Sequence, residues 1–137
     1  MKAVIDTNVI AYYLLRTEQF IEECTRFWHE LEEPMAPALW EAELVNVLWL
    51  MTRKNVVTLS EALNLLDLAE TLGIRSIAVG ELWHGALRRS CTFGVSPYDA
   101  LFVELAERES LPLATFDEGV IKAFPRVAMH PGKLTTS

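Results

Sequence analysis

The segment at residues 3–6, with the sequence AVID, places the tightest constraint on what this chain can fold into. Its three apolar residues, two of them β-branched, are followed at once by Asp6, Thr7 and Asn8. Such a short apolar run before polar groups is typical of a strand buried on both faces in a parallel sheet. Asp6 then lies at the carboxyl end of the strand, where open α/β sheets bind ligands. The alternative is an ordinary helix start, with Thr7 or Asn8 as the cap.

The size and hydrophobicity of the chain are suited to one compact domain. It has 137 residues and 51% hydrophobic content, so we expect a single domain over residues 1–137 with a loose polar tail at 130–137. No apolar run approaches the ~18 residues of a membrane span, and the apolar strip at the N-terminus is too short for a secretory signal. We therefore expect a cytoplasmic protein with no membrane partner.

The overall charge disfavours binding to nucleic acid. The net charge is −7, from 19 acidic and 12 basic residues, so any binding to a polyanion has to come from a local basic patch. The only adjacent bases are Arg53-Lys54 and Arg88-Arg89. A solvated helix end or helix face also explains each of these pairs.

Cysteine and histidine offer no site of their own. Cys24 and Cys91 lie far apart without metal-ligand spacing, so we expect neither a disulfide framework nor a zinc site, and interpret both as small core residues. The three histidines, His29, His84 and His130, are equally scattered and are expected on partly exposed helices or loops.

Apolar periodicity and turn residues predict that strands and helices alternate along the chain. The predicted strands lie at residues 3–5, 35–37, 74–79, 111–115 and 126–129. The predicted helices lie at residues 9–15, 18–33, 38–53, 59–72, 81–89, 97–109 and 120–123. This alternation is typical of an α/β fold.

The helix predicted at residues 38–53 is apolar almost all the way round, which predicts burial on more than one side. Glu43 and Asn46 are three residues apart and share one face of it, whereas Glu41 points elsewhere. A carboxylate in such surroundings is costly to bury unless it is paired, hydrogen-bonded or bound to a cation. Glu43 therefore requires a partner. The tryptophans are interpreted mainly as core, with a partner surface as the alternative: Trp28, Trp40, Trp49 and Trp83.

Two further acids lie where helices are predicted to begin. Ser96, Pro97 and Asp99 have the pattern of a helix start, with a cap, a first-turn proline and a first-turn acid. Asp117 follows the strand predicted at residues 111–115. Helix capping explains either acid without any chemistry.

The acids taken together are harder to explain by capping. Four of them are placed where this fold can bring them to one edge of the sheet: Asp6, Glu43, Asp99 and Asp117. Carboxylates that repel one another in one pocket favour a hard divalent cation, and Mg²⁺ or Mn²⁺ suits carboxylate and water ligands. Such a site is suited to phosphodiester hydrolysis, with one ion or two.

Four segments carry a resemblance to a known family: VIDTN at residues 4–8, ELVNVL at 43–48, SPYDAL at 96–101 and ATFD at 114–117. In this order and spacing the sequence resembles the PIN-domain ribonucleases of the VapC toxin type. The resemblance implies a three-layer α/β/α fold on a parallel sheet and a Mg²⁺-dependent endoribonuclease site. It also implies homodimers and inhibition by a cognate antitoxin protein.

Carried over to this chain, the resemblance implies a division of labour in RNA cleavage. Asp6 and Asp99 would hold the principal metal, while Glu43 and Asp117 would act through waters, a second metal or the attacking water. The supporting hydroxyl and amide groups would come from Asn8, Ser96 and Thr115. Asn46 is either a further supporting group or a packing residue.

Two alternatives of a different kind are a signalling receiver domain and a catalytically idle PIN-like module that binds proteins. A receiver domain would carry a phosphorylated Asp after its third strand, where this chain has Gly80. A haloacid-type phosphatase would need DxDxT near the first strand, where this chain has Asp6-Thr7-Asn8. Four intact acids disfavour the idle module.

Overall fold

The computed structural model describes residues 1–136, and its centre is one parallel sheet with the strand order β3-β2-β1-β4-β5. The strands are β1 (Lys2–Ile5), β2 (Glu33–Pro37), β3 (Arg75–Ile77), β4 (Leu113–Ala114) and β5 (Ala128–Met129). In the central register, Val4 pairs with Met35 of β2 on one side and with Leu113 of β4 on the other. All five strands therefore end at the same edge of the sheet.

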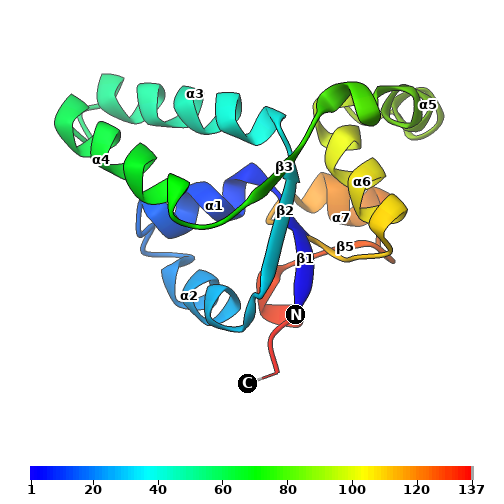
Figure 1. Cartoon of the computed structure of the whole chain (residues 1–137), viewed down its shortest axis with the longest axis horizontal. Coiled ribbons are helices and arrows are strands. Elements are labelled where there is room, and N and C mark those ends of the chain that lie inside the picture. Colours follow the sequence, from blue (N-terminus) through cyan, green and yellow to red (C-terminus); the bar gives the residue numbers. More distant parts are fainter. Residues whose placement is uncertain (137) are drawn as a thin grey trace.

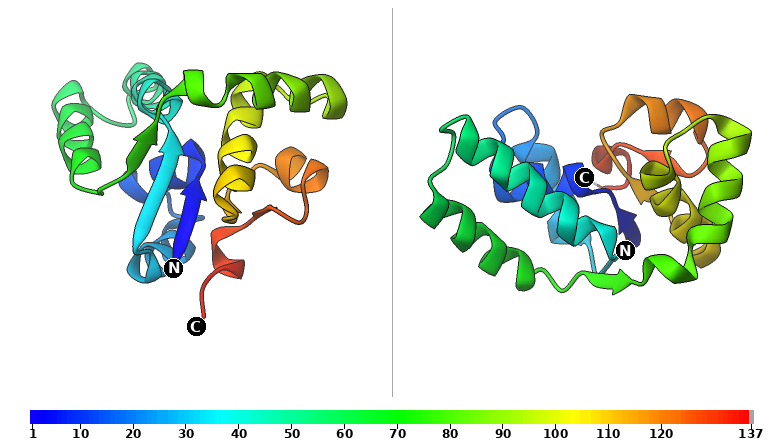
Figure 2. Two further views of the ribbon diagram at one scale, coloured as in Figure 1. Left: turned by 45° about the vertical axis from the view of Figure 1, so that its right-hand side comes forward. Right: turned by 90° about the horizontal axis from the view of Figure 1, so that it is seen from above.

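Helices cover both faces of this sheet (Figure 1). One layer holds α1 (Thr7–Leu14), α2 (Ile21–Glu30), α3 (Leu39–Arg53) and α4 (Leu59–Glu70). The other holds α5 (Trp83–Phe93), α6 (Pro97–Glu109) and α7 (Glu118–Ala123). Short 3₁₀ turns, η1 (Val79–Glu81) and η2 (Pro131–Lys133), precede α5 and follow β5. The predicted three-layer α/β/α fold is confirmed, and Figure 2 shows the two groups of helices apart from each other in two further views.

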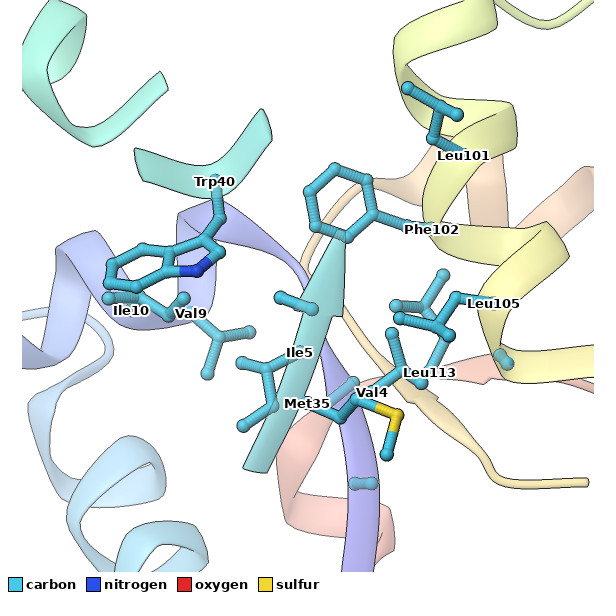
Figure 3. Close-up of a cluster of buried hydrophobic side chains, with 14 of the residues drawn as sticks. Val4, Ile5, Val9, Ile10, Met35, Trp40, Leu101, Phe102, Leu105 and Leu113 are labelled. Atoms are coloured by element: carbon cyan, nitrogen blue, oxygen red, sulfur yellow. The ribbon is translucent and has the colours of Figure 1, made fainter. Parts of the chain in front are cut away.

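The core lies on both sides of β1, as its composition predicted. Ala3, Val4 and Ile5 are all fully buried. Figure 3 shows Val9 of α1 beside the sheet on one side and Leu105 of α6 on the other. A strand sandwiched in this way needs apolar side chains on both faces, which is why the segment reads as a continuous apolar run.

Local helix signals in the sequence are matched by the observed helix ends. Thr58 and Glu61 form a capping box at the start of α4, and the loop after its end contains Gly73 with φ +69°. Ser96 caps α6 with Pro97 in its first turn. These features depend on residues within a few positions of one another, so the sequence predicts them directly.

The expectation that α3 is buried on more than one side is wrong. Trp40, Leu44 and Leu48 form its single buried stripe, while Val45 and Trp49 are each 52% exposed. The elements that pack on α3 are α1, α4 and β2, and its buried residues recur every four positions along one stripe. Its opposite side carries apolar residues that face solvent.

Two further assignments to the core are also wrong. Trp83 is 59% exposed on α5, so two of the four tryptophans lie on the surface. Cys24 is buried as predicted, whereas Cys91 is exposed on α5. Both misplaced residues lie on a helix that packs mainly against α6 and leaves its outer side open.

The C-terminal segment makes hydrogen bonds to α2 up to residue 136, and the looseness expected of residues 130–137 stays a prediction. Pro131 is buried, and the backbone N–H of Gly132 donates to Glu23 of α2 at 2.8 Å. Thr136 donates its backbone N–H and its hydroxyl to Glu30 of the same helix. Among residues 1–136, no helix is long and apolar enough to cross a membrane.

Candidate active site

The four acids predicted from the sequence line one cleft of about 460 Å³ at the carboxyl edge of the sheet. Asp6 follows β1 and Asp117 follows β4 by three residues; these strands are neighbours, with Ile5 paired to Ala114. Glu43 comes from α3 and Asp99 from the first turn of α6. The remaining residues that line the cleft are Thr7, Asn8, Leu39, Ala42, Asn46, Val47 and Tyr98.

Asp6 is held by a small network of buried polar groups. The fully buried hydroxyl of Thr115 donates to Asp6 Oδ2 at 2.7 Å and accepts from the backbone N–H of Asp117 at 3.0 Å. Asn8 Nδ2 lies 3.4 Å from the same Asp6 oxygen, and Asn8 Oδ1 accepts from the backbone N–H of Phe116. The segment after β4 is thereby tied to the acid after β1.

Glu43 has a partner that sequence reasoning missed. The hydroxyl of Thr7 donates to Glu43 Oε1 at 2.7 Å, across 36 positions of sequence. Thr7 and Asn8 were considered as caps of the first helix, but the N-cap of α1 is Asp6 and no side chain caps this helix. The only signal in the sequence is a hydroxyl residue directly after an acid at a strand end.

Asp99 and Asp117 take part in helix starts and also line the cleft. The backbone N–H of Asp99 donates to Ser96 Oγ at 3.1 Å, and Asp117 Oδ1 accepts from the backbone N–H of Val120 at 3.1 Å. Ser96 is exposed and does not line the cleft, whereas Asn46 does. The start of α6 uses the backbone N–H of Asp99, and the start of α7 uses one carboxylate oxygen of Asp117, so both roles are compatible with a place in the site.

The charges in the cleft repel one another. Burial raises the pKa of Asp6 to about 7; the hydrogen bond from Thr115 opposes this rise, and the charges of Asp99 and Glu43 add to it. Burial and the charge of Asp99 raise the pKa of Glu43, against the bond from Thr7. Burial and the charge of Asp117 raise the pKa of Asp99, against the bond from Ser96. The cluster thus carries more negative charge than its surroundings stabilise.

The donor set fits a hard divalent cation. The cleft is lined by carboxylate, hydroxyl and amide oxygens, and no lysine or arginine is among its lining residues. Within residues 1–136, no three acidic, histidine or cysteine side chains converge closely enough to hold an ion directly. Mg²⁺ nevertheless commonly binds through one or two carboxylates and several waters, so a wide cleft is compatible with it.

Solved structures with the same fold come from several organisms. The crystal structure of PAE2754 from Pyrobaculum aerophilum matches with a TM-score of 0.70 at 20% identity, covering 98% of this chain and 86% of that one. FitAcB from Neisseria gonorrhoeae matches with a TM-score of 0.68 at 22% identity, covering 96% of this chain and 98% of that one. A toxin-antitoxin complex from Klebsiella pneumoniae matches with a TM-score of 0.66 at 13% identity, covering 94% of this chain and 97% of that one. At these identities the likeness shows the fold.

The family itself follows from the sequence. No curated protein matches the chain significantly. The family model described as "PIN domain" matches residues 3–128, a span that contains the whole cleft described above. PIN domains are generally nucleases. The match, the parallel sheet and the place of the cleft agree, and this chain belongs to the PIN domain family.

Proposed function

We propose that this chain is a Mg²⁺-dependent endoribonuclease, with Mn²⁺ as an alternative ion, and the VapC-type toxin of a toxin–antitoxin pair in the cytoplasm. The observation that carries the proposal is the cleft itself. Four carboxylates from four separate elements line it without a basic residue, and the pKa of Asp6 is raised to about 7. Half-buried acids of this kind are stabilised by a cation, and a cation beside a cleft is suited to phosphodiester chemistry.

In this proposal each residue has a distinct role. Asp6 and Asp99 hold the principal ion, and Glu43 and Asp117 contribute through waters or accept a proton from the attacking water. When bound, the ion supplies positive charge for the phosphate and makes water more acidic. Thr115 and Asn8 keep Asp6 in position, and Thr7 does the same for Glu43.

Glu43 is suited to the work of a general base. It is half-buried, and its pKa is raised by burial and by Asp99, so it accepts a proton more readily than an ordinary carboxylate. The bond from Thr7 to Oε1 restricts its rotamer. Asn46, one turn further along α3, lines the same cleft, which supports its proposed role as a further supporting group over that of a packing residue.

The proposed partners are an antitoxin protein and a second copy of the chain. Two matched structures are a toxin-antitoxin complex from Klebsiella pneumoniae and VapBC2 from Rickettsia felis bound to a promoter DNA fragment. Large apolar side chains stay exposed on α4 and α5, among them Leu63, Leu68 and Leu87. Apolar surface of this kind is typical of a protein that buries it against a partner.

The test is incubation of the purified chain with total RNA in Mg²⁺, in Mn²⁺ or in EDTA. We expect cleavage that needs the ion and is lost in Asp6→Asn and Asp99→Asn. Glu41→Gln is the matched control, because Glu41 lies on the same helix as Glu43 but accepts from Ser76 outside the cleft. Cleavage that survives in EDTA, or in both Asn variants, would refute the proposed site.

Membership of the PIN domain family removes the receiver-domain alternative and leaves the idle binding module. A wild-type chain that cleaves no RNA in either ion, yet binds an antitoxin, would support that module. Sedimentation at several protein concentrations tests the proposed homodimer independently of cleavage.

A further inference from the structure

We propose that the C-terminal half of α3, around Trp49 and Arg53, is a binding site for single-stranded RNA that continues out of the carboxylate cleft. Trp49 stacks on a nucleobase, and Arg53 binds a neighbouring phosphate. This inference rests on the proposed nuclease function, for which it supplies a path for the substrate strand.

The first support is the geometry of α3. Ala42 and Asn46 line the cleft, and Trp49 and Arg53 follow them at spacings of three and four residues. Residues at these spacings share one face of a helix. Trp49 is six residues beyond Glu43, which is about 9 Å along the helix axis. Figure 1 shows α3 beginning above the edge of the sheet and running away from it. The stripe therefore continues along α3 beyond the residues that line the cleft.

The second support is the state of the tryptophan. The indole of Trp49 is 52% exposed, and the guanidinium carbon of Arg53 lies 5.0 Å from the centre of its ring. A half-exposed tryptophan with a guanidinium over its ring combines the two groups that bind single strands, because every base has a face to stack and every nucleotide has a phosphate.

The third support is the local charge. Residues 44–60 contain no acid and include Arg53 and Lys54, although the whole chain has 19 acids against 12 bases. The first acid after this segment is Glu61, whose side chain is engaged in the capping box of α4. A polyanion that is repelled by the rest of the surface is attracted here. This charge favours an anionic ligand, and the half-exposed indole of Trp49 favours RNA over an acidic peptide, because nucleobases stack on an aromatic ring.

The exposed tryptophan of α5 is surrounded differently. Trp83 lines an apolar hollow with Leu87, Pro97 and Leu101, in which His84 is the only titratable side chain apart from Tyr98. That surface has no arginine or lysine among its lining residues. Trp83 is therefore the matched control: a second tryptophan of similar exposure that lacks the basic neighbour.

The experiment measures the binding of a fluorescein-labelled 12-residue oligouridylate by anisotropy, in EDTA so that nothing is cleaved. We expect Trp49→Ala to weaken binding about tenfold, the loss of one stacked base. Arg53→Gln should weaken binding and lower the salt slope by about 0.7, which corresponds to one phosphate contact on a single strand. Trp83→Ala should bind like the wild type.

Binding of inorganic polyphosphate of similar charge distinguishes base stacking from charge attraction, because polyphosphate has phosphates but no bases. Arg53→Gln should weaken its binding, whereas Trp49→Ala should not. The proposal is overturned if the wild type does not bind the oligouridylate, or if Trp49→Ala and Trp83→Ala affect it equally. It is also overturned if Trp49→Ala leaves RNA affinity intact but disrupts the dimer or the antitoxin complex, since the surface is then a protein interface.

Failure of the nuclease proposal gives a different result. A wild-type chain that binds the oligouridylate through Trp49 but cleaves no RNA in Mg²⁺ or Mn²⁺ supports this site and contradicts the proposed activity. A chain that cleaves RNA with unchanged efficiency and affinity in Trp49→Ala supports the activity and overturns this site.

Discussion

Helix α6 carries two acids in opposite electrostatic situations. Asp99, in its first turn, shares a cleft with three other carboxylates. Glu104, five residues later, is buried between two arginines: Arg89 Nε and Arg108 Nε each donate to one of its oxygens at 2.8 Å. Burial raises the pKa of Glu104, but the bonds and charges of Arg89 and Arg108 outweigh it and lower the pKa.

The comparison separates an acid that serves the fold from acids that require a ligand. Glu104 has its cations supplied by the chain, so it joins α5 to α6 and needs nothing further. Gly85 of α5 makes room for it, since a Cβ there would lie 2.2 Å from its carboxylate. The cleft acids have hydroxyl and amide partners, and no lysine or arginine lines their cleft. The difference predicts opposite results when the two kinds of acid are neutralised.

The largest expected effect is on activity. Asp6→Asn should lower metal-dependent RNA cleavage by more than about 100-fold, because it removes a proposed ligand, and even residues that orient ligands are worth 10–100-fold. A folded Glu104→Gln variant should cleave within a few-fold of the wild type. Initial rates at equal concentrations of folded protein provide the measurement. Equal losses in the two variants would mean that Asp6 contributes no more to cleavage than Glu104 does.

For stability we expect the opposite order: the loss of Glu104 should destabilise the fold more than the loss of Asp6. Glu104→Leu should lower the free energy of unfolding by about 3 kcal/mol, because it leaves Arg89 of α5 and Arg108 of α6 without the acid that they share. Glu107→Gln, an exposed acid on the same helix, is the control and should change it by less than about 0.5 kcal/mol. Urea denaturation gives both values. A stable Glu104→Leu protein would show that the ion pairs do not hold α5 in place.

The third prediction concerns pH. Because the folded pKa of Asp6 is raised to about 7, its contribution to stability is complete below its unfolded pKa, about 3.9, and is lost as pH rises through 7. In EDTA, Asp6→Asn should therefore gain about 2 kcal/mol over the wild type at pH 8 and little at pH 4. The lowered pKa of Glu104 acts in the opposite direction: its contribution is lost as pH falls.

Urea denaturation at the two pH values measures this difference. Mg²⁺ should stabilise the wild type at pH 8 and leave Asp6→Asn nearly unchanged, because a ligand that binds only the folded state raises its stability. Parallel pH curves for wild type and Asp6→Asn would show that Asp6 is not the strained acid of the cleft.

The smallest expected effect concerns the residue that the sequence did not reveal. Thr7→Val keeps the shape of the side chain but removes the bond to Glu43 Oε1. We expect cleavage to fall about tenfold, since a misoriented carboxylate costs less than a missing one. Thr7→Ser should restore most of the rate. A rate profile against pH should shift to higher pH in Thr7→Val, because this bond lowers the pKa of Glu43.

The sequence by itself determined which elements form and where the acids sit on them. Residues 3–5 are apolar because β1 is covered on both faces, and Thr58, Glu61 and Ser96 mark helix starts through bonds that span three residues. The parallel direction of the strands follows from the alternation of elements, and it predicts that Asp6 and Asp117 lie at the same edge of the sheet; the strand order itself comes from the tertiary structure. These features depend on local spacing, so a pattern in the chain is enough to predict them.

Only the tertiary structure decided which side of a helix is covered and which distant side chains meet. Trp40 and Trp49 lie on the same apolar helix, yet Trp40 is 7% and Trp49 52% exposed, because Trp40 lies on the buried stripe of α3 with Leu44 and Leu48 and Trp49 lies outside it. Thr7 reaches Glu43 across 36 positions, and Gly85 opposes Glu104 across the α5–α6 contact. Burial and long-range contacts depend on how elements pack together, and the residue pattern within one element does not show which other elements will contact it.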